Sequence, residues 1–291
     1  MDEKELEQRL EAMSKKGLIF SIRREGKTLY NAAHFMIGLY EYSVKKIDKE
    51  LAKLFKEYYD TAYLNEIGRS NIPGFKVLPV EERIQTGTVL YPYLKLKESI
   101  RKARKIAVTE CICPKEARLN GEGCDYPLET RLSFGAAAEY YIENGMGREI
   151  TADEAIKIIE EADRAGLVHA GVNSKHLSNI CNCCPCCCAS MKGITKLGHD
   201  KHKYLNAMFE SIIDQENCIG CGVCVDRCPV RAITLEETAT VDRNKCLGCG
   251  LCATTCPQEA ITLKLREDFE EPFNRVIEMG MAILKAKKKN K

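Results

Sequence analysis

The chain lacks the features of a membrane or secreted protein. No apolar run among its 291 residues approaches the roughly 18 that a membrane-spanning helix needs. The first residues, Met1-Asp2-Glu3-Lys4, are charged and carry no apolar core of a secretory signal. We therefore expect a cytoplasmic protein without a membrane span, in a reducing compartment where cysteines remain thiols or bind metal.

The chain also lacks a strong net charge. It has 44 Lys and Arg against 42 Asp and Glu, which gives a formal net charge of +2. Nucleic acid or acidic lipid would need a far more basic chain, so neither is an expected partner. Residues 214–271 are locally acidic, with eleven acidic and six basic side chains. That charge suits a basic redox partner protein, and an ordinary solvated surface explains it equally well.

Cysteine, by contrast, is abundant, with 17 residues. Eight of them form two runs of the pattern C-x2-C-x2-C-x3-C-P, and the second run follows the first by 28 residues. The Ala-Ile-Thr-Leu segment at 232–235 recurs at 260–263 with the same offset. The repeat therefore covers a whole structural unit and not the cysteines alone.

This spacing predicts two cubane [4Fe-4S] clusters. Three closely spaced thiolates let one tight loop supply three of four ligands, and the fourth cysteine of each run reaches the other cluster. One cluster is expected on Cys218, Cys221, Cys224 and Cys256, and the other on Cys246, Cys249, Cys252 and Cys228. Zinc sites and a disulfide framework are the alternatives, but zinc prefers paired C-x2-C units and disulfides suit short secreted chains.

On these motifs, residues 214–265 resemble a bacterial-type two-cluster ferredoxin domain. Such domains have two short hairpins that flank two cluster-binding loops, and the Ala-Ile-Thr-Leu segments fall where the family places a strand. The resemblance implies one-electron transfer.

Nine further cysteines lie upstream: Cys111, Cys113, Cys124, Cys181, Cys183, Cys184, Cys186, Cys187 and Cys188. Six of them fall within eight residues, which packing does not explain, so metal is the simplest account. We expect the first three on loops because of the nearby glycines and Pro127. The two stretches would share one site or form two, with either an iron–sulfur cluster or zinc on four thiolates. His169, His176, His199 and His202 are expected to be ordinary core or surface residues.

The rest of the chain predicts an α+β fold with a mainly helical N-terminal and middle region and small strands. A helix at 2–16 and a hairpin at 18–30 look like the second half of a winged helix, without the helices that normally come first. Residues 35–67 predict one long amphipathic helix, whose apolar seam suits the protein's own core or a homodimer.

Shorter elements are expected between these and the ferredoxin-like domain. We predict strands at 75–78 and 106–109, helices at 94–105 and 134–144, and a helix capped by Thr151 and stopped by Gly166. A helix at 271–284 leads into a basic tail. The expected divisions are a winged-helix-like segment plus long helix (1–70), an α+β domain with the cysteine-rich site (71–205), the ferredoxin domain (210–265) and the C-terminal helix and tail (266–291).

The order of these motifs resembles a group of 4Fe-4S dicluster-domain proteins from anaerobic bacteria and archaea. The shared pattern includes C-I-C at 111–113, the segments 123–130 and 134–145, and I-C-N-C-C-P-C-C-C at 180–188. Relatives often have cysteine where this chain has Arg131. The resemblance implies electron transfer and names no substrate.

The sequence therefore favours an electron-transfer component of an oxidoreductase system over a stand-alone enzyme. Single electrons would pass through two [4Fe-4S] clusters, between an unidentified redox partner protein and the upstream metal site. No catalytic residue is assigned. One alternative is a redox-responsive winged-helix regulator, and another is an oxidoreductase whose upstream cysteines form the active site.

Overall fold

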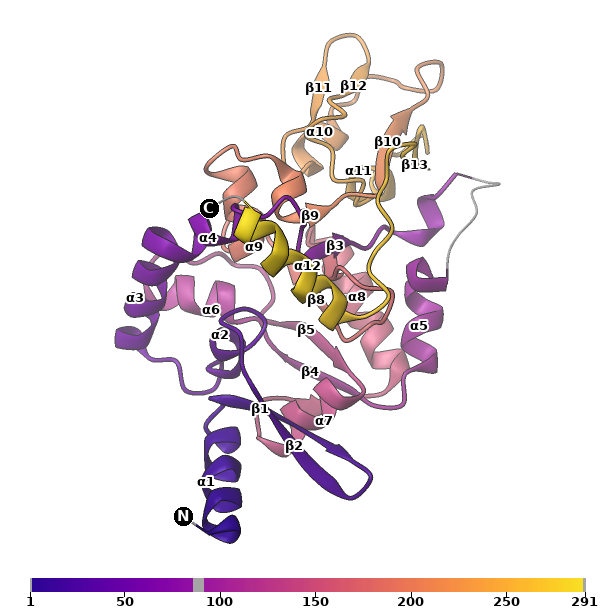
Figure 1. Ribbon diagram of the computed structural model, residues 1–291. Helices are drawn as coiled ribbons and strands as arrows, with labels where there is room; N and C mark the ends of the chain where they lie inside the picture. The colour runs from indigo at the N-terminus through magenta and orange to yellow at the C-terminus, as the bar shows by residue number, and fades with distance from the viewer. Residues whose placement is uncertain (1, 86–91, 290–291) are drawn as a thin grey trace.

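A seven-stranded sheet forms the centre of the molecule. The computed structural model describes residues 2–85 and 92–289 (Figure 1). The strand order is β6-β4-β5-β8-β7-β3-β9, with antiparallel neighbours except for the parallel pair β3 and β9. The strands are β3 (Phe75–Val77), β4 (Ile106–Glu110), β5 (Glu129–Phe134), β6 (Arg148–Glu149), β7 (Val168–Val172), β8 (Asn179–Cys183) and β9 (Leu205–Asn206).

This sheet corrects one expectation about the middle region. The α+β class agrees with the mixed helices and strands, and the strands predicted at 75–78 and 106–109 are confirmed as β3 and β4. A mainly helical region with small strands is wrong, however, because residues 75–206 supply all seven strands of one sheet. The short β6 and β9 strands are stabilised by their neighbours and have little sequence signal of their own.

Helices α5 (Leu96–Lys102) and α8 (Ala152–Ala165) cover one face of the sheet. Their Ile100 and Ile159 pack in one apolar cluster with Ile180 of β8. At the start of α8 the Thr151 hydroxyl accepts a hydrogen bond from the Glu154 amide. Gly166, with a left-handed φ of 88°, ends the helix, as predicted. The predicted helix at 94–105 is confirmed as the shorter α5.

The opposite face holds the larger core, into which the upstream cysteines project. Alternate residues of a strand face opposite sides. Ile180 therefore faces α8, while Cys181 and Cys183 belong to the other core. Helix α6 (Ile112–Leu119) contributes Ile112 and Cys113 to that core, and α7 (Ala136–Glu143) and α9 (Ala189–Thr195) pack on the same cluster.

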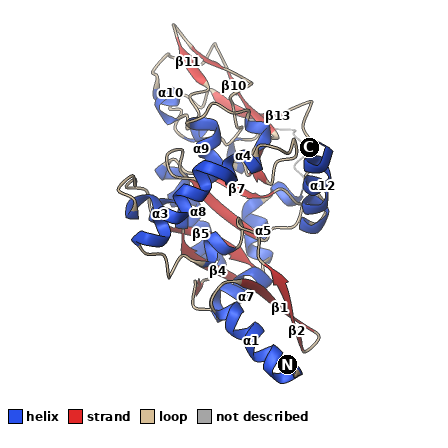
Figure 2. Ribbon diagram, turned by 60° about the vertical axis from the view of Figure 1, so that its left-hand side comes forward, coloured by secondary structure: helices blue, strands red, loops and turns tan. Residues whose placement is uncertain are grey.

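The N-terminal helix and hairpin lie at one end of the molecule, opposite the ferredoxin-like region (Figure 2). Both predicted elements are confirmed, as α1 (Glu3–Lys15) and the antiparallel pair β1 (Ile19–Arg24) and β2 (Lys27–Ala32). The Tyr140 hydroxyl of α7 donates to the Ile19 carbonyl at 2.8 Å. The hairpin thus packs on the sheet domain through α7.

The long helix predicted at 35–67 is wrong. The segment consists of α2 (Leu39–Tyr42), α3 (Lys49–Tyr58), a π-helical turn (Tyr59–Tyr63) and α4 (Leu64–Ile67). The Asp48 carboxylate accepts a hydrogen bond from the Leu51 amide at 2.8 Å, and this N-cap starts α3 as a new helix. Val44 and Ile47, which lie in the break, are buried in the chain's own core. The continuous seam expected for a homodimer is therefore not present.

The strands expected at 232–235 and 260–263 occur at the top of Figure 1, where one of the two expected hairpins forms and the other is replaced by a pairing of the first and last strands of the region. Strand β10 (Phe209–Ile213) pairs with β13 (Ile261–Leu265), and β11 (Ile233–Leu235) pairs with β12 (Ala239–Val241). Short helices α10 (Val223–Arg227) and α11 (Leu251–Thr254) follow the first two cysteines of each run and contain the third. The C-terminal helix α12 (Val276–Lys289) starts later than predicted and continues into the basic tail, where Lys287 pairs with Glu66 at 2.9 Å. None of the described helices is long and apolar enough to cross a membrane.

Candidate metal centres

Four of the ferredoxin-type cysteines surround one small cavity near the tip of the molecule. We call Cys218, Cys221, Cys224 and Cys256 the outer set, and all four line a cavity of about 20 Å³. Cys256 comes from the second cysteine run, so the structure places the fourth thiol of one run beside the first three of the other. Cys221 is exposed and Cys224 is buried. The outer set is thus the more accessible of the two expected cluster positions.

The inner set, Cys228, Cys246, Cys249 and Cys252, lies deeper. Cys246, Cys249 and Cys252 are buried, and the other three thiols of the set all interact electrostatically with Cys249. Burial raises the pKa of the Cys249 thiol well above its usual value, so this thiol is neutral unless a cation binds it. An iron–sulfur cluster supplies that cation, and a donor set of four cysteine sulfurs is the one that such clusters require.

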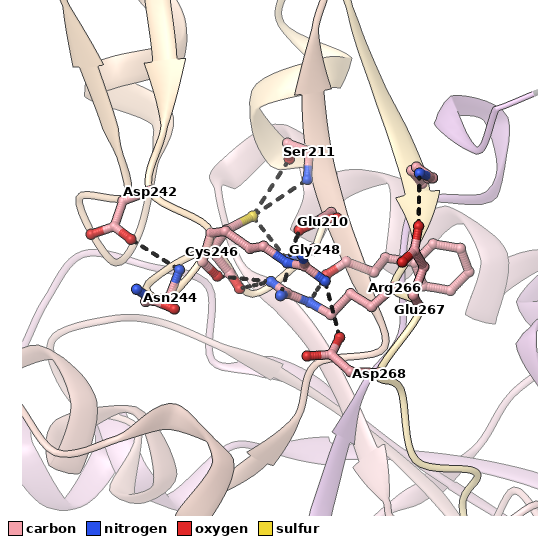
Figure 3. A network of polar contacts seen from close by, with 12 residues as sticks. Glu210, Ser211, Asp242, Asn244, Cys246, Gly248, Arg266, Glu267 and Asp268 are labelled. Atoms are coloured by element: carbon pink, nitrogen blue, oxygen red, sulfur yellow. Dashed lines mark hydrogen bonds and ion pairs between the residues drawn. The ribbon is translucent and has the colours of Figure 1, made fainter.

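Backbone amides donate to the sulfurs of both sets. The Ser211 and Gly248 amides donate to the Cys246 sulfur at 3.5 and 3.4 Å (Figure 3). The Ala232 amide donates to Cys228 at 3.1 Å, and the Ala239 amide to Cys218 at 3.5 Å. Such bonds stabilise thiolates and raise the reduction potential of a cluster that they hold.

Two buried cations flank the backbone of Cys246. Arg266 donates from Nη2 to the Cys246 carbonyl at 3.0 Å, and Lys201 donates from Nζ to the same oxygen at 2.7 Å (Figure 3 shows Arg266). Burial, followed by the charge of Arg266, lowers the pKa of Lys201 to about 8. The inner set therefore lies in a positive environment that favours the more negative, reduced state of a bound cluster.

We expect Arg266→Gln to lower the reduction potential of the inner cluster by tens of millivolts, on the order of what one poorly screened charge supplies. Arg243→Gln is the matched control, because Arg243 and Arg266 both pair with the same oxygen of Glu210. The Arg243 side chain is 52% exposed and that of Arg266 is 5% exposed, so solvent should screen most of the Arg243 charge. Redox titration followed by electron paramagnetic resonance measures both shifts, and equal shifts would contradict the argument.

The nine upstream cysteines separate into two groups. The five-thiol group, Cys111, Cys113, Cys181, Cys183 and Cys188, lines a second cavity of about 30 Å³. The four-thiol group consists of Cys124, Cys184, Cys186 and Cys187. The adjacent residues Cys183 and Cys184 therefore belong to different groups.

Strand and helix geometry together produce the five-thiol group. Cys181 and Cys183 are two apart on β8 and face the same side. Cys111 is the N-cap of α6 and Cys113 lies in its first turn, where the helix dipole favours a thiolate. The expectation of loops for the first cysteine stretch is wrong for Cys113, because Gly121, Gly123 and Pro127 come after this helix. A hydrogen bond from Cys111 is the largest factor that lowers the pKa of Cys113.

A buried ion pair completes the five-thiol cavity. Arg131 donates from Nη1 to the Cys181 sulfur at 3.1 Å and lies 3.8 Å from Glu41. Within the described part of the chain, the buried Arg131 Nε and Nη2 atoms have no hydrogen-bond acceptor. Burial raises the pKa of Glu41 to about 7, against the effect of Arg131. Hydrogen bonding from Cys183, and then the charge of Arg131, lower the pKa of Cys181 to about 6.

Sequence reasoning missed several of these charged residues. Glu41, Lys201 and Arg266 are buried, yet each lies in a short polar or mixed stretch that has the appearance of a surface segment. Glu41 falls between two tyrosines, and this was the one available signal of a buried carboxylate. His169 is buried, with its Nδ1 atom 2.6 Å from the Asn182 side-chain oxygen, which is an ordinary core interaction.

Comparison with known families agrees with the geometry of the C-terminal region. Residues 211–263 match the family model of the 4Fe-4S dicluster domain. The match contains both cysteine runs and none of the upstream cysteines. No curated protein matches the chain.

Proposed function

We propose that this protein carries two [4Fe-4S] clusters, on the outer and inner sets, and passes single electrons through them to a metal centre in the five-thiol group. The family match supports iron–sulfur electron transfer as the general function. The difference in burial between the two sets is the observation that carries the finer proposal, because it indicates which set an external partner reaches first.

The outer cluster would be the point of exchange with a soluble partner. Cys221 is exposed, and Ile219, two residues before it, is 63% exposed. Leu235, which also lines the outer cavity, is exposed as well. Apolar side chains at the rim of a redox centre suit transient docking of a partner protein, with the acidic charge of this region favouring a basic partner.

The inner cluster would pass electrons onward into the sheet domain. Cys249 shares one core cluster with Cys113, Cys181 and Cys183 of the five-thiol group. The Val80 amide donates to the Cys249 carbonyl at 3.3 Å, so the segment that follows β3 is hydrogen-bonded to the loop that carries the inner set. A continuous packed core between the two centres supports transfer without domain motion.

The five-thiol group suits an iron–sulfur centre on chemical grounds. Several buried thiolates need positive charge, and neutral packing does not supply it. Arg131 offers one cation and free donors toward this cavity, and bound iron would supply the rest. A guanidinium that donates to a ligand sulfur would also raise the potential of the centre, which favours inward electron flow.

The test uses the full-length protein purified without oxygen. We expect more than about eight irons and eight sulfides per chain, since each cubane contributes four of each. After reduction, the magnetic resonance spectrum should show the interaction of two neighbouring one-electron clusters, and the protein should reduce a soluble c-type cytochrome. Clusters that strong low-potential donors leave oxidised, or reduced protein that transfers no electrons, would contradict the proposal.

A further inference from the structure

We infer that the four-thiol group, Cys124, Cys184, Cys186 and Cys187, binds one tetrahedral thiophilic metal ion, a single zinc or iron without sulfide. This site is separate from the clusters of the proposed function and does not depend on them.

The spacing of the sulfurs is the first observation. All four Sγ atoms lie within 4.8 Å of one another. Cys187 is 3.5 Å from Cys124 and 3.6 Å from Cys186, and Cys124 is 4.0 Å from Cys184. A tetrahedral ion with metal–sulfur bonds of about 2.3 Å places its ligands about 3.8 Å apart. A cubane core separates its four thiolates more widely, because each one binds a different iron.

The outer and inner sets provide an internal comparison. Within residues 2–85 and 92–289, neither of those sets has the close mutual spacing of the four-thiol group. The close spacing expected around a single ion therefore distinguishes the four-thiol group from the two ferredoxin-type sets.

The loop that carries Cys124 is built to hold its position. The Arg118 guanidinium donates to the Cys124 carbonyl from Nε at 2.9 Å and to the Tyr126 carbonyl at 2.8 Å. A Cβ atom at Gly123 would lie 2.1 Å from the Arg118 side chain, so only glycine lets the loop approach this closely. These contacts fix Cys124 on the side facing the other three thiols.

The other three ligands come from the turn between β8 and α9. Pro185 lies within this turn, and the Cys187 amide donates to the Cys184 sulfur at 3.4 Å. A hydrogen bond from a backbone amide to a sulfur two or three residues earlier stabilises a thiolate in a metal-binding turn. Ala117, Ala162 and Leu167 surround the thiols with apolar surface. In that environment the four sulfurs can all be ionised only when a cation is bound to them.

The four protein ligands leave no open coordination position, which is the property of a structural or electron-transfer ion and not of a Lewis acid. Its place in the fold suggests what it holds together. Cys186 and Tyr126 line a cavity whose other wall is Arg227 and Cys228 of the ferredoxin-like region. Arg227 also donates to the Arg164 carbonyl at 3.0 Å. The ion would fix the loops on which the inner cluster rests.

Metal and sulfide counts on the full-length protein test the site. The double variant Cys186→Ser, Cys187→Ser should lose about one metal ion per chain and no sulfide. The matched control, Cys113→Ser with Cys183→Ser, alters the five-thiol group and should leave that ion in place. Loss of iron and sulfide in equal numbers from the first variant, or no loss at all, would overturn the inference.

A measurement on the unmodified protein covers the case in which that variant does not fold. If the ion is zinc, X-ray absorption at the zinc edge should show a shell of sulfur only, at about 2.3 Å. If it is iron, Mössbauer spectroscopy should show one tetrathiolate iron apart from the cluster irons. An oxygen or nitrogen ligand in the shell, or no ion of either kind, would refute the site. Neither result depends on whether the clusters transfer electrons, so the two proposals fail separately.

Discussion

Cys221→Ser should remove about four irons and four sulfides from the protein and slow its reduction of a soluble acceptor by more than about tenfold. Cys221 is the exposed member of the outer set, and the outer cluster is the proposed point of exchange. The inner cluster should remain, because its ligands Cys246, Cys249 and Cys252 are buried and belong to the second cysteine run. Iron and sulfide analysis, magnetic resonance and acceptor kinetics measure the three effects. The coupled signal of two clusters should become the simple signal of one.

Val223→Ser is the matched control for this variant. Val223 lies between Cys221 and Cys224 at the start of α10, is exposed and offers no ligand, so both clusters should remain after its replacement. Acceptor reduction should change much less than in the cysteine variant. A Cys221→Ser protein that reduces the acceptor as fast as the parent would exclude entry through the outer cluster and favour a structural or sensing function for the domain.

Gly248→Ala should abolish loading of the inner cluster. Gly248 has a left-handed φ of 64°, and a Cβ atom here would lie 2.1 Å from the Phe209 carbonyl oxygen of β10. The cluster loop and the strand would then have to separate by more than an ångström. The hydrogen bonds from the Gly248 and Ser211 amides to the Cys246 sulfur would be lost at the same time. We expect about half of the ferredoxin-type iron to be absent and the thermal midpoint of the domain to fall sharply.

Gly198→Ala is the control that separates the effect of the close contact with β10 from the cost of a left-handed backbone conformation. Gly198 has the same φ of 64°, but no atom lies within 4 Å of the position that its Cβ would take. This variant should lose only the roughly 1–2 kcal/mol that a left-handed non-glycine residue costs, and should keep all its iron. If both variants load iron equally, the close approach of the loop to β10 is not what the inner site requires.

Local spacing supports the predictions that depend on neighbouring residues alone. The two cysteine runs imply cluster loops because three ligands of each set lie within seven residues, and a tight loop alone can bring them together. The capped helix α8 was equally predictable, since Thr151 and Gly166 act on their own neighbours. Expectations that rested on periodicity alone were weaker. The pattern at 35–67 contains Asp48, whose carboxylate starts a second helix inside an apparently continuous stripe.

The sequence by itself predicted two cubane-type ligand sets and showed nine further cysteines that packing does not explain. Only the tertiary structure decided how those nine divide. Cys183 ends strand β8 with its side chain in the larger core, while Cys184 begins the turn that follows, so adjacent residues belong to different groups. Cys124 joins that turn across 60 residues, and Glu41 reaches Arg131 across 90. Such pairings depend on the order of strands in the sheet, which long-range packing selects and local sequence does not encode.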